Sequence, residues 1–407
     1  HTAYRRQRQM CIRDRYKDMI NIADIHDCFG CGVCAKACPK QIITLRLNQN
    51  GFYEPRIEPA DQCIKCSACI EVCAFISKDE TAGRRPASYA AWSLDNEIRM
   101  DSSSGGIAFE IGRQMLQRGY KICGVRYNYA KQIPEHYIAR NEEELKASSG
   151  SKYLQSNTVD GFAEIDIRSK HVVIGTPCQI ASFRRYIRRT KAEPNFILID
   201  FFCHGVPSML LWRKYLRTIG ENAKLTDIKW RSKRRGWHDS YAISYKYTTS
   251  AGTKHCFSSL SDGDIFLKVF LNDLCLNSSC YKRCKYKLDN SAADLRVGDL
   301  WGSRYQHDEQ GVSALIPFTD RGQNIVEILQ GCHISEIPFE TAAEGQMREN
   351  ARQPGNYEHI MSLLRNPKIS LRQIERYVTR REQLTRIANH ARHPIAAIQK
   401  LIKRMTK

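Results

Sequence analysis

Hydrophobic and polar positions change their spacing several times along the chain. Residues 171–189 begin with an apolar run of strand type, pass a tight turn at "GTP", and continue with apolar positions at helical spacing. Residues 195–217 repeat this scheme, and segments 89–93 and 293–302 each add another run of strand type. Alternating strands and helices predict an α/β body with a largely parallel sheet.

The two ends of the chain follow different patterns. "QIITLRL" and "GFYEPRI", at 41–47 and 51–57, predict a short hairpin with its turn at 48–51. Residues 351–407 hold thirteen Lys/Arg and only three Asp/Glu, and their apolar positions predict one helix that ends at Pro394 and a second basic helix after it. Such a tail could contact an anionic membrane surface or pack on the body, and the pattern leaves both open.

The chain is strongly basic, with or without its first eighteen residues. The 407 residues carry a formal net charge of +20. Residues 1–18 resemble translated adapter sequence, and Met19 is a plausible native start, although a real basic arm stays open. Without that segment the charge is +16, because it holds six Lys/Arg and two Asp/Glu. Nucleic acid, anionic lipid, a phosphorylated cofactor or an acidic redox partner would each suit this balance.

Cysteine usage narrows the chemistry. We see no apolar run near the roughly 18 residues that span a bilayer, and no signal peptide, so a soluble, cytoplasmic protein is expected. Seventeen cysteines in such a chain, several at CxxC spacing, indicate metal or redox chemistry instead of disulfides.

Two cysteine runs share the spacing C-x2-C-x2-C-x3-C, which is typical of bacterial-type ferredoxins. In that pattern three cysteines of one run and the last cysteine of the other hold each [4Fe–4S] cluster. The predicted ligand sets are Cys28, Cys31, Cys34 and Cys73 for one cluster, and Cys63, Cys66, Cys69 and Cys38 for the other. Structural zinc is the alternative, but pairs separated by longer loops suit zinc better than three closely spaced cysteines.

Four further cysteines are expected at one edge of the sheet. Cys178 and Cys203 each follow a predicted strand, and Cys280 and Cys284 lie in the loop "NSSCYKRCKYK". Ligands of open α/β sheets collect at the carboxyl ends of the strands. We therefore predict that these thiolates hold a third [4Fe–4S] cluster, with four-thiolate zinc and unliganded thiols as alternatives.

A family resemblance follows from the order of several motifs. "SSSGG", "SGSKYLQSNT", "VVIGTPCQIASF", "DFFCHGVPS" and "ADLRVGDLWG" occur in the order seen in the beta-subunit family of coenzyme F-420 hydrogenase and dehydrogenase, which this chain resembles over roughly 19–320. Members of that family are flavin-containing iron–sulfur reductases. The three residues between Cys280 and Cys284 depart from the two found in many members.

The resemblance implies a set of FAD contacts. The Ser/Gly helix start and a lysine suit a pyrophosphate, and hydroxyl and amide groups suit the rest of the flavin. The implied contacts are Ser104, Gly105, Gly106, Ser151, Lys152, Tyr153, Gln155, Ser156, Thr176, Pro177 and Gln179.

The expected organisation is a ferredoxin-like 2[4Fe–4S] module of α+β type, the α/β body, and a helical tail. The boundaries are 1–18 for the leader, 19–80 for the ferredoxin domain, 81–170 and 171–335 for the two parts of the body, and 336–407 for the tail.

The predicted function is an oxidoreductase that passes electrons from a reduced carrier, such as a ferredoxin, through the clusters to FAD and an organic substrate. The alternative is an electron-transfer subunit of a larger complex. Polysaccharide biosynthesis is a further expectation from the resemblance. Nucleic acid is not an expected partner, because no recognised nucleic-acid module accompanies the basic stretches at 184–191 and 229–237, which suit a solvated face or the rim of an anionic cofactor.

Overall fold

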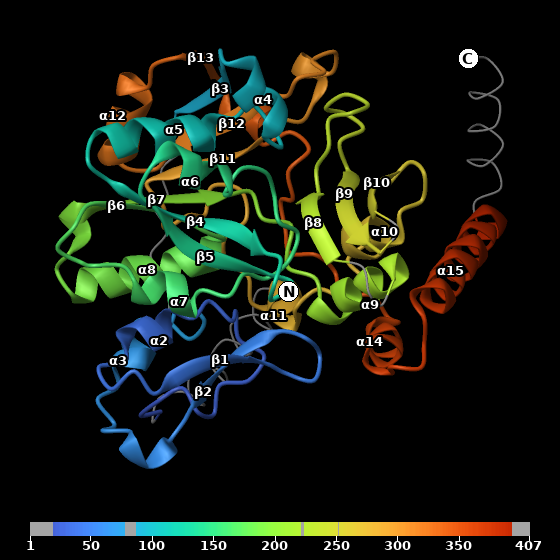
Figure 1. Cartoon of the computed structure of the whole chain (residues 1–407), viewed down its shortest axis with the longest axis horizontal. Coiled ribbons are helices and arrows are strands. Elements are labelled where there is room, and N and C mark those ends of the chain that lie inside the picture. The colour runs from blue at the N-terminus through green and yellow to red at the C-terminus, as the bar shows by residue number, and fades with distance from the viewer. Residues whose placement is uncertain (1–18, 78–86, 221–223, 251, 393–407) are drawn as a thin grey trace.

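The structure is a computed structural model that describes residues 19–77, 87–220, 224–250 and 252–392. The predicted leader and the second helix of the tail lie outside these residues. No helix in the described ranges is long and apolar enough to cross a membrane. Figure 1 shows a small N-terminal module in blue, a large sheet with helices on both sides, and a third unit toward the C-terminus.

The N-terminal module is built around the predicted hairpin. Strands β1 and β2 pair antiparallel from Ile43↔Ile57 to Leu47↔Tyr53, which confirms the hairpin. The Asn48 side-chain oxygen accepts hydrogen bonds from the backbone N–H groups of Asn50 and Phe52 and closes the turn. The elements of the module are α2 (Val33–Ala37), β1 (Ile43–Leu47), β2 (Tyr53–Ile57), η1 (Ala60–Gln62) and α3 (Ala68–Glu71).

The body is an eight-stranded sheet with the order β13-β3-β12-β11-β7-β6-β4-β5. The strands are β3 (Ser88–Ser93), β4 (Lys121–Asn128), β5 (Ile133–Ala139), β6 (His171–Ile174), β7 (Phe196–Phe201), β11 (Leu295–Asp299), β12 (Ser313–Pro317) and β13 (Cys332–Ile337).

The sheet is parallel only at its centre. Strands β4, β6, β7 and β11 run parallel, whereas β5 on one side and β12, β3 and β13 on the other pair antiparallel with their neighbours. The connection from β4 to β5 is too short for the crossover that a parallel pair needs. The expectation of a largely parallel sheet therefore describes the centre, and the whole sheet is mixed.

Helices cover both faces of the central strands, because successive residues of each strand point to opposite faces. Val172 and Ile197 join one core with α5 and α12, and their neighbours Val173 and Leu198 join a second core with α7 and α8. The helices of the body are α4 (Asn96–Asp101), α5 (Ile107–Gln117), α6 (Glu142–Lys146), α7 (Val159–Ala163), α8 (Pro177–Arg189), η2 (Glu193–Asn195), η3 (Ser303–Tyr305), α12 (Asp320–Ile328) and α13 (Phe339–Ala342).

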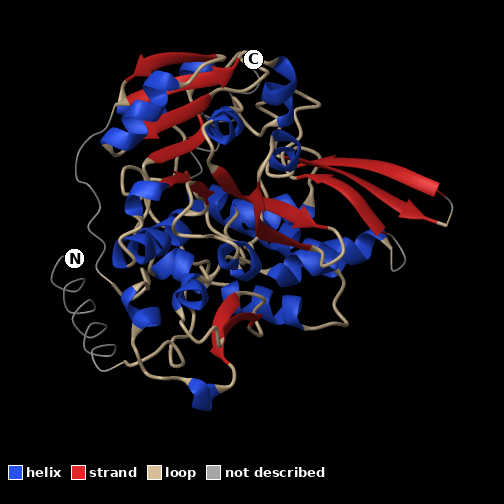
Figure 2. Ribbon diagram, turned by 60° about the vertical axis from the view of Figure 1, so that its left-hand side comes forward, coloured by secondary structure: helices blue, strands red, loops and turns tan. Residues whose placement is uncertain are grey.

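A three-stranded antiparallel sheet projects from the body (Figure 2). Its base shares one core with the helices of the tail. Ile374 and Val378 of the predicted tail helix are buried in this core, whereas Leu384 is exposed, so the described part of the tail packs on the protein. The elements are α9 (Met209–Ile219), β8 (Lys224–Lys229), β9 (Ala242–Thr249), β10 (Gly252–Ser259), α10 (Ile265–Leu271), α11 (Ser278–Lys282), α14 (Tyr357–Arg365) and α15 (Leu371–Arg392).

Candidate functional site

The eight cysteines of the N-terminal module surround two separate cavities. In each, three thiols come from one run and the fourth from the other run, in the exchange that the spacing predicts. The first, here called the inner cavity, is lined by Cys28, Cys31, Cys34 and Cys73. The second, here called the outer cavity, is lined by Cys38, Cys63, Cys66 and Cys69.

The local backbone of both runs is set by left-handed residues. Gly30 and Gly32 have φ values of +61° and +72° in the first run, and the residues at the corresponding positions of the second run, Lys65 and Ser67, have φ values of +54° and +58°. The Gly30 N–H donates a hydrogen bond to Cys28 Sγ. In the first run this left-handed turn therefore directs a backbone N–H toward a cysteine sulfur.

The glycines of the first run are required by the close approach of the body. A Cβ atom on Gly30 would lie 2.3 Å from Gln155 Nε2, and one on Gly32 would lie 2.0 Å from Thr158 Oγ1. At the equivalent places Lys65 is exposed and Ser67 is half-buried, so side chains fit there. The first run therefore contacts the body at its two glycines, whereas the second run contacts it further along, through Glu71 and Ala74.

The module is held on the body by buried polar contacts. The Gln155 side chain accepts a hydrogen bond from the Tyr53 N–H at 2.8 Å and donates one to the Phe29 carbonyl at 3.0 Å. The Thr158 hydroxyl donates to the Cys31 carbonyl, and Val33 enters the core formed with α7 and α8. Helix α2, which carries Cys34, lies against α7 and α8 of the body (Figure 1). The inner cavity, which Cys34 lines, is therefore on the side of the module that faces the body.

Burial makes the inner thiols poor acids in the absence of a bound cation. It raises the pKa of Cys28 and Cys34 well above the ordinary thiol value, and the neighbouring thiols raise both further. A thiolate at such a position needs a positive charge close to the sulfur, and a metal centre supplies one.

The four cysteines predicted at the sheet edge lie in one neighbourhood. Burial raises the pKa of the Cys178 thiol, and the negative charges that Cys203 and Cys280 would carry as thiolates raise it further. Burial also raises the pKa of Cys203 and Cys280, and a charge on Cys284 would raise both further. Two of these thiols follow the parallel strands β6 and β7, and the other two flank the end of α11. The group formed by Cys178, Cys203, Cys280 and Cys284 is here called the third thiol group.

The third thiol group adjoins the inner cavity. Cys178 and Cys284 pack against the apolar cluster that contains Cys28 and Cys34. Cys31 also contributes to the raised pKa of Cys178. No group of three or more His, Cys, Asp or Glu side chains in the described residues is spaced to hold a single metal ion.

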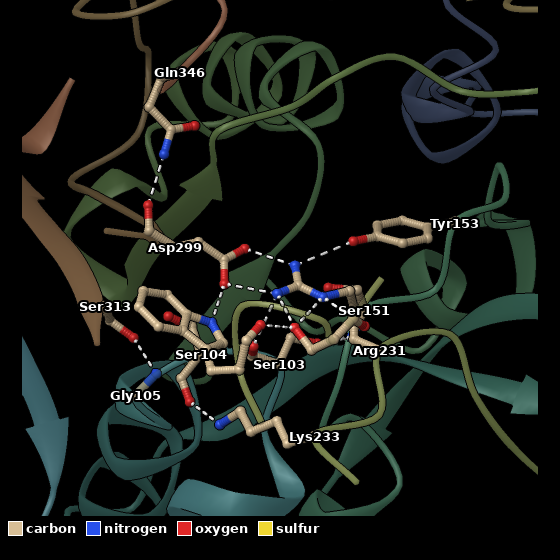
Figure 3. Close-up of polar contacts among 12 residues, drawn as sticks. Ser103, Ser104, Gly105, Ser151, Tyr153, Arg231, Lys233, Asp299, Ser313 and Gln346 are labelled. Carbon is tan, nitrogen blue, oxygen red and sulfur yellow. Dashed lines mark hydrogen bonds and ion pairs between the residues drawn. The ribbon is translucent and has the colours of Figure 1, made fainter. Parts of the chain in front are cut away.

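The Ser/Gly loop and the segment 149–153 meet beside a buried ion pair (Figure 3). Ser103 Oγ accepts a hydrogen bond from the Ser151 N–H at 2.8 Å. The Arg231 guanidinium forms two hydrogen bonds with the Asp299 carboxylate, at 2.9 and 3.2 Å, and donates to the Tyr153 hydroxyl at 3.3 Å. This pair holds the projecting sheet against the body.

Two ammonium groups in this region contact only carbonyl oxygens. Lys152 donates to the carbonyls of residues 147, 149 and 150, and the buried Lys233 donates to those of residues 99, 104 and 310. Burial lowers the pKa of each to about 7. Neither forms an ion pair with a carboxylate of the described residues, so both would gain from a bound anion.

The remaining predicted flavin contacts have local partners. Ser104 Oγ donates to the Val312 carbonyl, and the Gly105 N–H donates to Ser313 Oγ. Gly106 is the left-handed N-cap of α5. At the start of α8, where Pro177 is the first residue, the Gln179 side chain accepts from the Thr176 N–H and donates to Ser156 Oγ.

Sequence reasoning missed Arg231, Lys233 and Asp299 as members of this region. Arg231 and Lys233 lie in the basic stretch 229–237, for which a solvated face and a cofactor rim were both expected, and both side chains are buried. Their place beside Trp230 and Trp237 is the signal that could have indicated burial, because cations are rarely interleaved with core tryptophans on an exposed face.

Comparisons with known proteins match three parts of the chain to described families. Residues 27–75 match the family described as "4Fe-4S dicluster domain". Residues 88–161 and 169–338 match the N-terminal and C-terminal families of "Coenzyme F420 hydrogenase/dehydrogenase, beta subunit". The chain belongs to this beta-subunit family. The C-terminal match includes the third thiol group, Cys178, Cys203, Cys280 and Cys284.

The relatives are distant. A coenzyme F420-dependent sulfite reductase of Methanocaldococcus jannaschii is 24% identical over 331 residues, which are 78% of this chain and 48% of the relative. An uncharacterized protein of the same organism is 24% identical over 48% of this chain and 64% of its own length. The chain therefore spans about half to two thirds of these curated relatives. A chain of the F420-reducing [NiFe] hydrogenase complex from Methanosarcina barkeri aligns over 68% of this chain and 99% of its own, with 16% identity and a TM-score of 0.40.

Proposed function

We propose that this protein is an iron–sulfur flavoprotein oxidoreductase that passes electrons from a reduced carrier, through [4Fe–4S] clusters, to FAD and an organic substrate or coenzyme. The observation that carries this proposal is the line of three thiol groups. The outer cavity opens at the surface, the inner cavity lies against the body, and the third thiol group adjoins the inner cavity at the sheet edge.

The donor sets fit three cubane clusters. Each group supplies four thiols, the ligand number of a [4Fe–4S] cluster, and such clusters transfer single electrons. The proposed ligands are Cys28, Cys31, Cys34 and Cys73 in the inner cavity, Cys38, Cys63, Cys66 and Cys69 in the outer cavity, and Cys178, Cys203, Cys280 and Cys284 in the third thiol group.

The Ser/Gly region fits the anionic part of FAD. A pyrophosphate there would meet the N-terminus of α5 and compensate the ammonium groups of Lys152 and Lys233. Ser104, Gly105, Gly106 and Ser151–Tyr153 would hold that part, and Ser156, Thr176, Pro177 and Gln179 would lie toward Cys178. Flavin links one-electron delivery to two-electron reduction of a substrate. Gln155, which the resemblance also implies, has both side-chain groups engaged by the ferredoxin module.

Iron content tests the clusters. Anaerobically purified protein should contain about twelve irons per chain, and Cys284→Ala should contain about eight with the ferredoxin-type signals retained. Cys256→Ala is the matched control, because Cys256 lies on the projecting sheet, and it should leave the iron content unchanged. Equal iron in Cys284→Ala and the wild type would disprove the third cluster.

Flavin release tests the second cofactor. Heat-treated protein should release about one FAD per chain. Lys152→Ala should lower that occupancy, and Lys146→Ala on the exposed side of α6 should not. Protein that neither releases flavin nor binds added FAD would rule out the flavin part of the proposal.

The second candidate is an electron-transfer subunit whose catalytic acceptor lies on another polypeptide. It is supported by the matches of residues 88–161 and 169–338 to families described for a beta subunit. Turnover of an organic acceptor by the isolated chain separates the two candidates. A role in polysaccharide biosynthesis stays a prediction from the family resemblance.

A further inference from the structure

The outer cavity is the part of the electron path that faces solvent. Cys66 is exposed, whereas Cys28 and Cys34 of the inner cavity are buried. The cavity is rimmed by two exposed apolar side chains, Ile20 at 47% and Ile64 at 56% exposure. Two exposed apolar side chains at one rim offer a partner surface a shared apolar contact.

The part of the second run beside the outer cavity is exposed in the folded chain at Ile64, Lys65 and Cys66. At the two left-handed positions the first run has glycine, because the body approaches within 2.0–2.3 Å of the missing Cβ atoms. The second run has Lys65 and Ser67 there, with the same backbone turn. A partner can therefore approach the outer cavity without any change in the fold.

Among the described residues, the one charged side chain that lines the outer cavity is a lysine. Lys40 lines it and is exposed, and Lys65 is exposed between Cys63 and Cys66. Neither lysine forms an ion pair with a described carboxylate, and no Asp or Glu is among the lining residues. Neither Lys65 nor the exposed Asp61 of η1 is among the lining residues. Lysines around an apolar centre attract a partner surface that carries carboxylates around its own apolar centre.

We propose that Ile20, Lys40, Ile64 and Lys65 form the docking surface for a small acidic redox protein. The inference rests on the proposed function, because it assigns the outer cavity as the place where that carrier exchanges electrons. In each encounter one electron leaves the reduced carrier, and one [4Fe–4S] centre goes from the 2+ to the 1+ state. The contact is transient, since such complexes bury little area and depend on charge for their association rate.

Flavodoxin, an acidic redox protein, serves as the probe. Its oxidised form is titrated anaerobically against the full chain, so that binding is measured without electron transfer. A Lys40→Glu/Lys65→Glu variant should bind about five-fold or more weakly than the wild type. Ile20→Asp, which lies outside the cysteine runs, should also weaken binding. Raising the ionic strength should weaken binding to the wild type and have less effect on the double variant.

The matched control is Lys254→Glu on β10, an exposed lysine of the projecting sheet, which should bind within two-fold of the wild type. Equal weakening in Lys254→Glu and the double variant would make the effect one of net charge and overturn the proposed surface. Absence of flavodoxin binding to the wild type at low ionic strength would overturn the acidic partner.

Iron content separates this proposal from the proposed function. If the wild type and the variants hold full iron and bind flavodoxin equally, only the docking surface is wrong. If the wild type holds no iron in the ferredoxin module, the proposed function fails. In that case the docking surface is still tested by the difference in flavodoxin Kd between the wild type and the double variant, because binding of the oxidised probe needs no electron transfer.

Discussion

Ser182 offers the sharpest test of how the body acts on the inner cavity. Its hydroxyl lies 3.3 Å from Cys31 Sγ and accepts a hydrogen bond from the Ala74 N–H at 3.2 Å. A cluster-bound cysteine has no thiol proton, so the hydroxyl must then be the donor to sulfur. Ser182 lies one turn after Cys178 on α8, so a single helix carries a ligand of the third thiol group and a hydrogen-bond donor to the inner one.

Removing this hydroxyl should lower the reduction potential of the inner cluster. A reduced cluster carries one more negative charge, and a donor to its sulfur therefore stabilises the reduced form more than the oxidised form. If the difference equals the net value of one hydrogen bond, about 0.5–1.5 kcal/mol, the shift is roughly 20–60 mV for a one-electron couple. Ser182 is buried, and water is therefore poorly placed to replace the hydroxyl in Ser182→Ala.

The assay is a redox titration of the wild type, Ser182→Ala and Ser182→Thr, followed by electron paramagnetic resonance. Ser182→Ala should show one midpoint potential that is lower by this amount, while the other potentials stay in place. Ser182→Thr keeps the hydroxyl and should restore the wild-type value. Identical potentials in wild type and Ser182→Ala, at equal iron content, would refute the hydrogen-bond argument.

Three further predictions concern stability. Asp200→Asn should lower the free energy of unfolding, measured by urea denaturation, by about 3–5 kcal/mol. The reason is that it leaves the buried Arg296 guanidinium without the carboxylate that now binds it at 2.7 Å. The double variant Asp200→Leu/Arg296→Met should recover much of this loss. Burial lowers the pKa of His136 to about 4, so the unfolded chain takes up a proton that the folded chain does not, and stability should fall by up to about 3 kcal/mol as the pH is lowered from about 6.5 to 4; a His136→Gln variant with the same pH dependence would contradict this. Gly32→Ala should lower the free energy of unfolding by at least about 2 kcal/mol and reduce iron retention, because its Cβ would meet the Thr158 hydroxyl. Ser67→Ala, at the equivalent left-handed position of the second run, should change little in the same thermal unfolding and iron measurements.

The sequence by itself determined the features that depend on spacing and local pattern. The exchange of Cys38 and Cys73 between the cavities follows from the two repeated runs, and the hairpin follows from alternation around Asn48. Cys178 and Cys203 come together because two apolar strands, each followed by a turn and a helix, become neighbouring parallel strands. These outcomes need only short-range geometry and the rules of α/β connection.

The tertiary structure decided which groups remain available for function. Gly30 and Gly32 do not reveal their neighbours in the sequence, and only the packed body shows that they admit Gln155 and Thr158. Lys152 and Lys233 belong to different motifs, yet both are desolvated beside the Ser/Gly loop. Burial and long-range pairing arise when distant segments meet, and no local pattern encodes the neighbours that a side chain then acquires. For the same reason the identical cysteine spacing in the two runs could not tell the cavity that faces the body from the one that faces solvent.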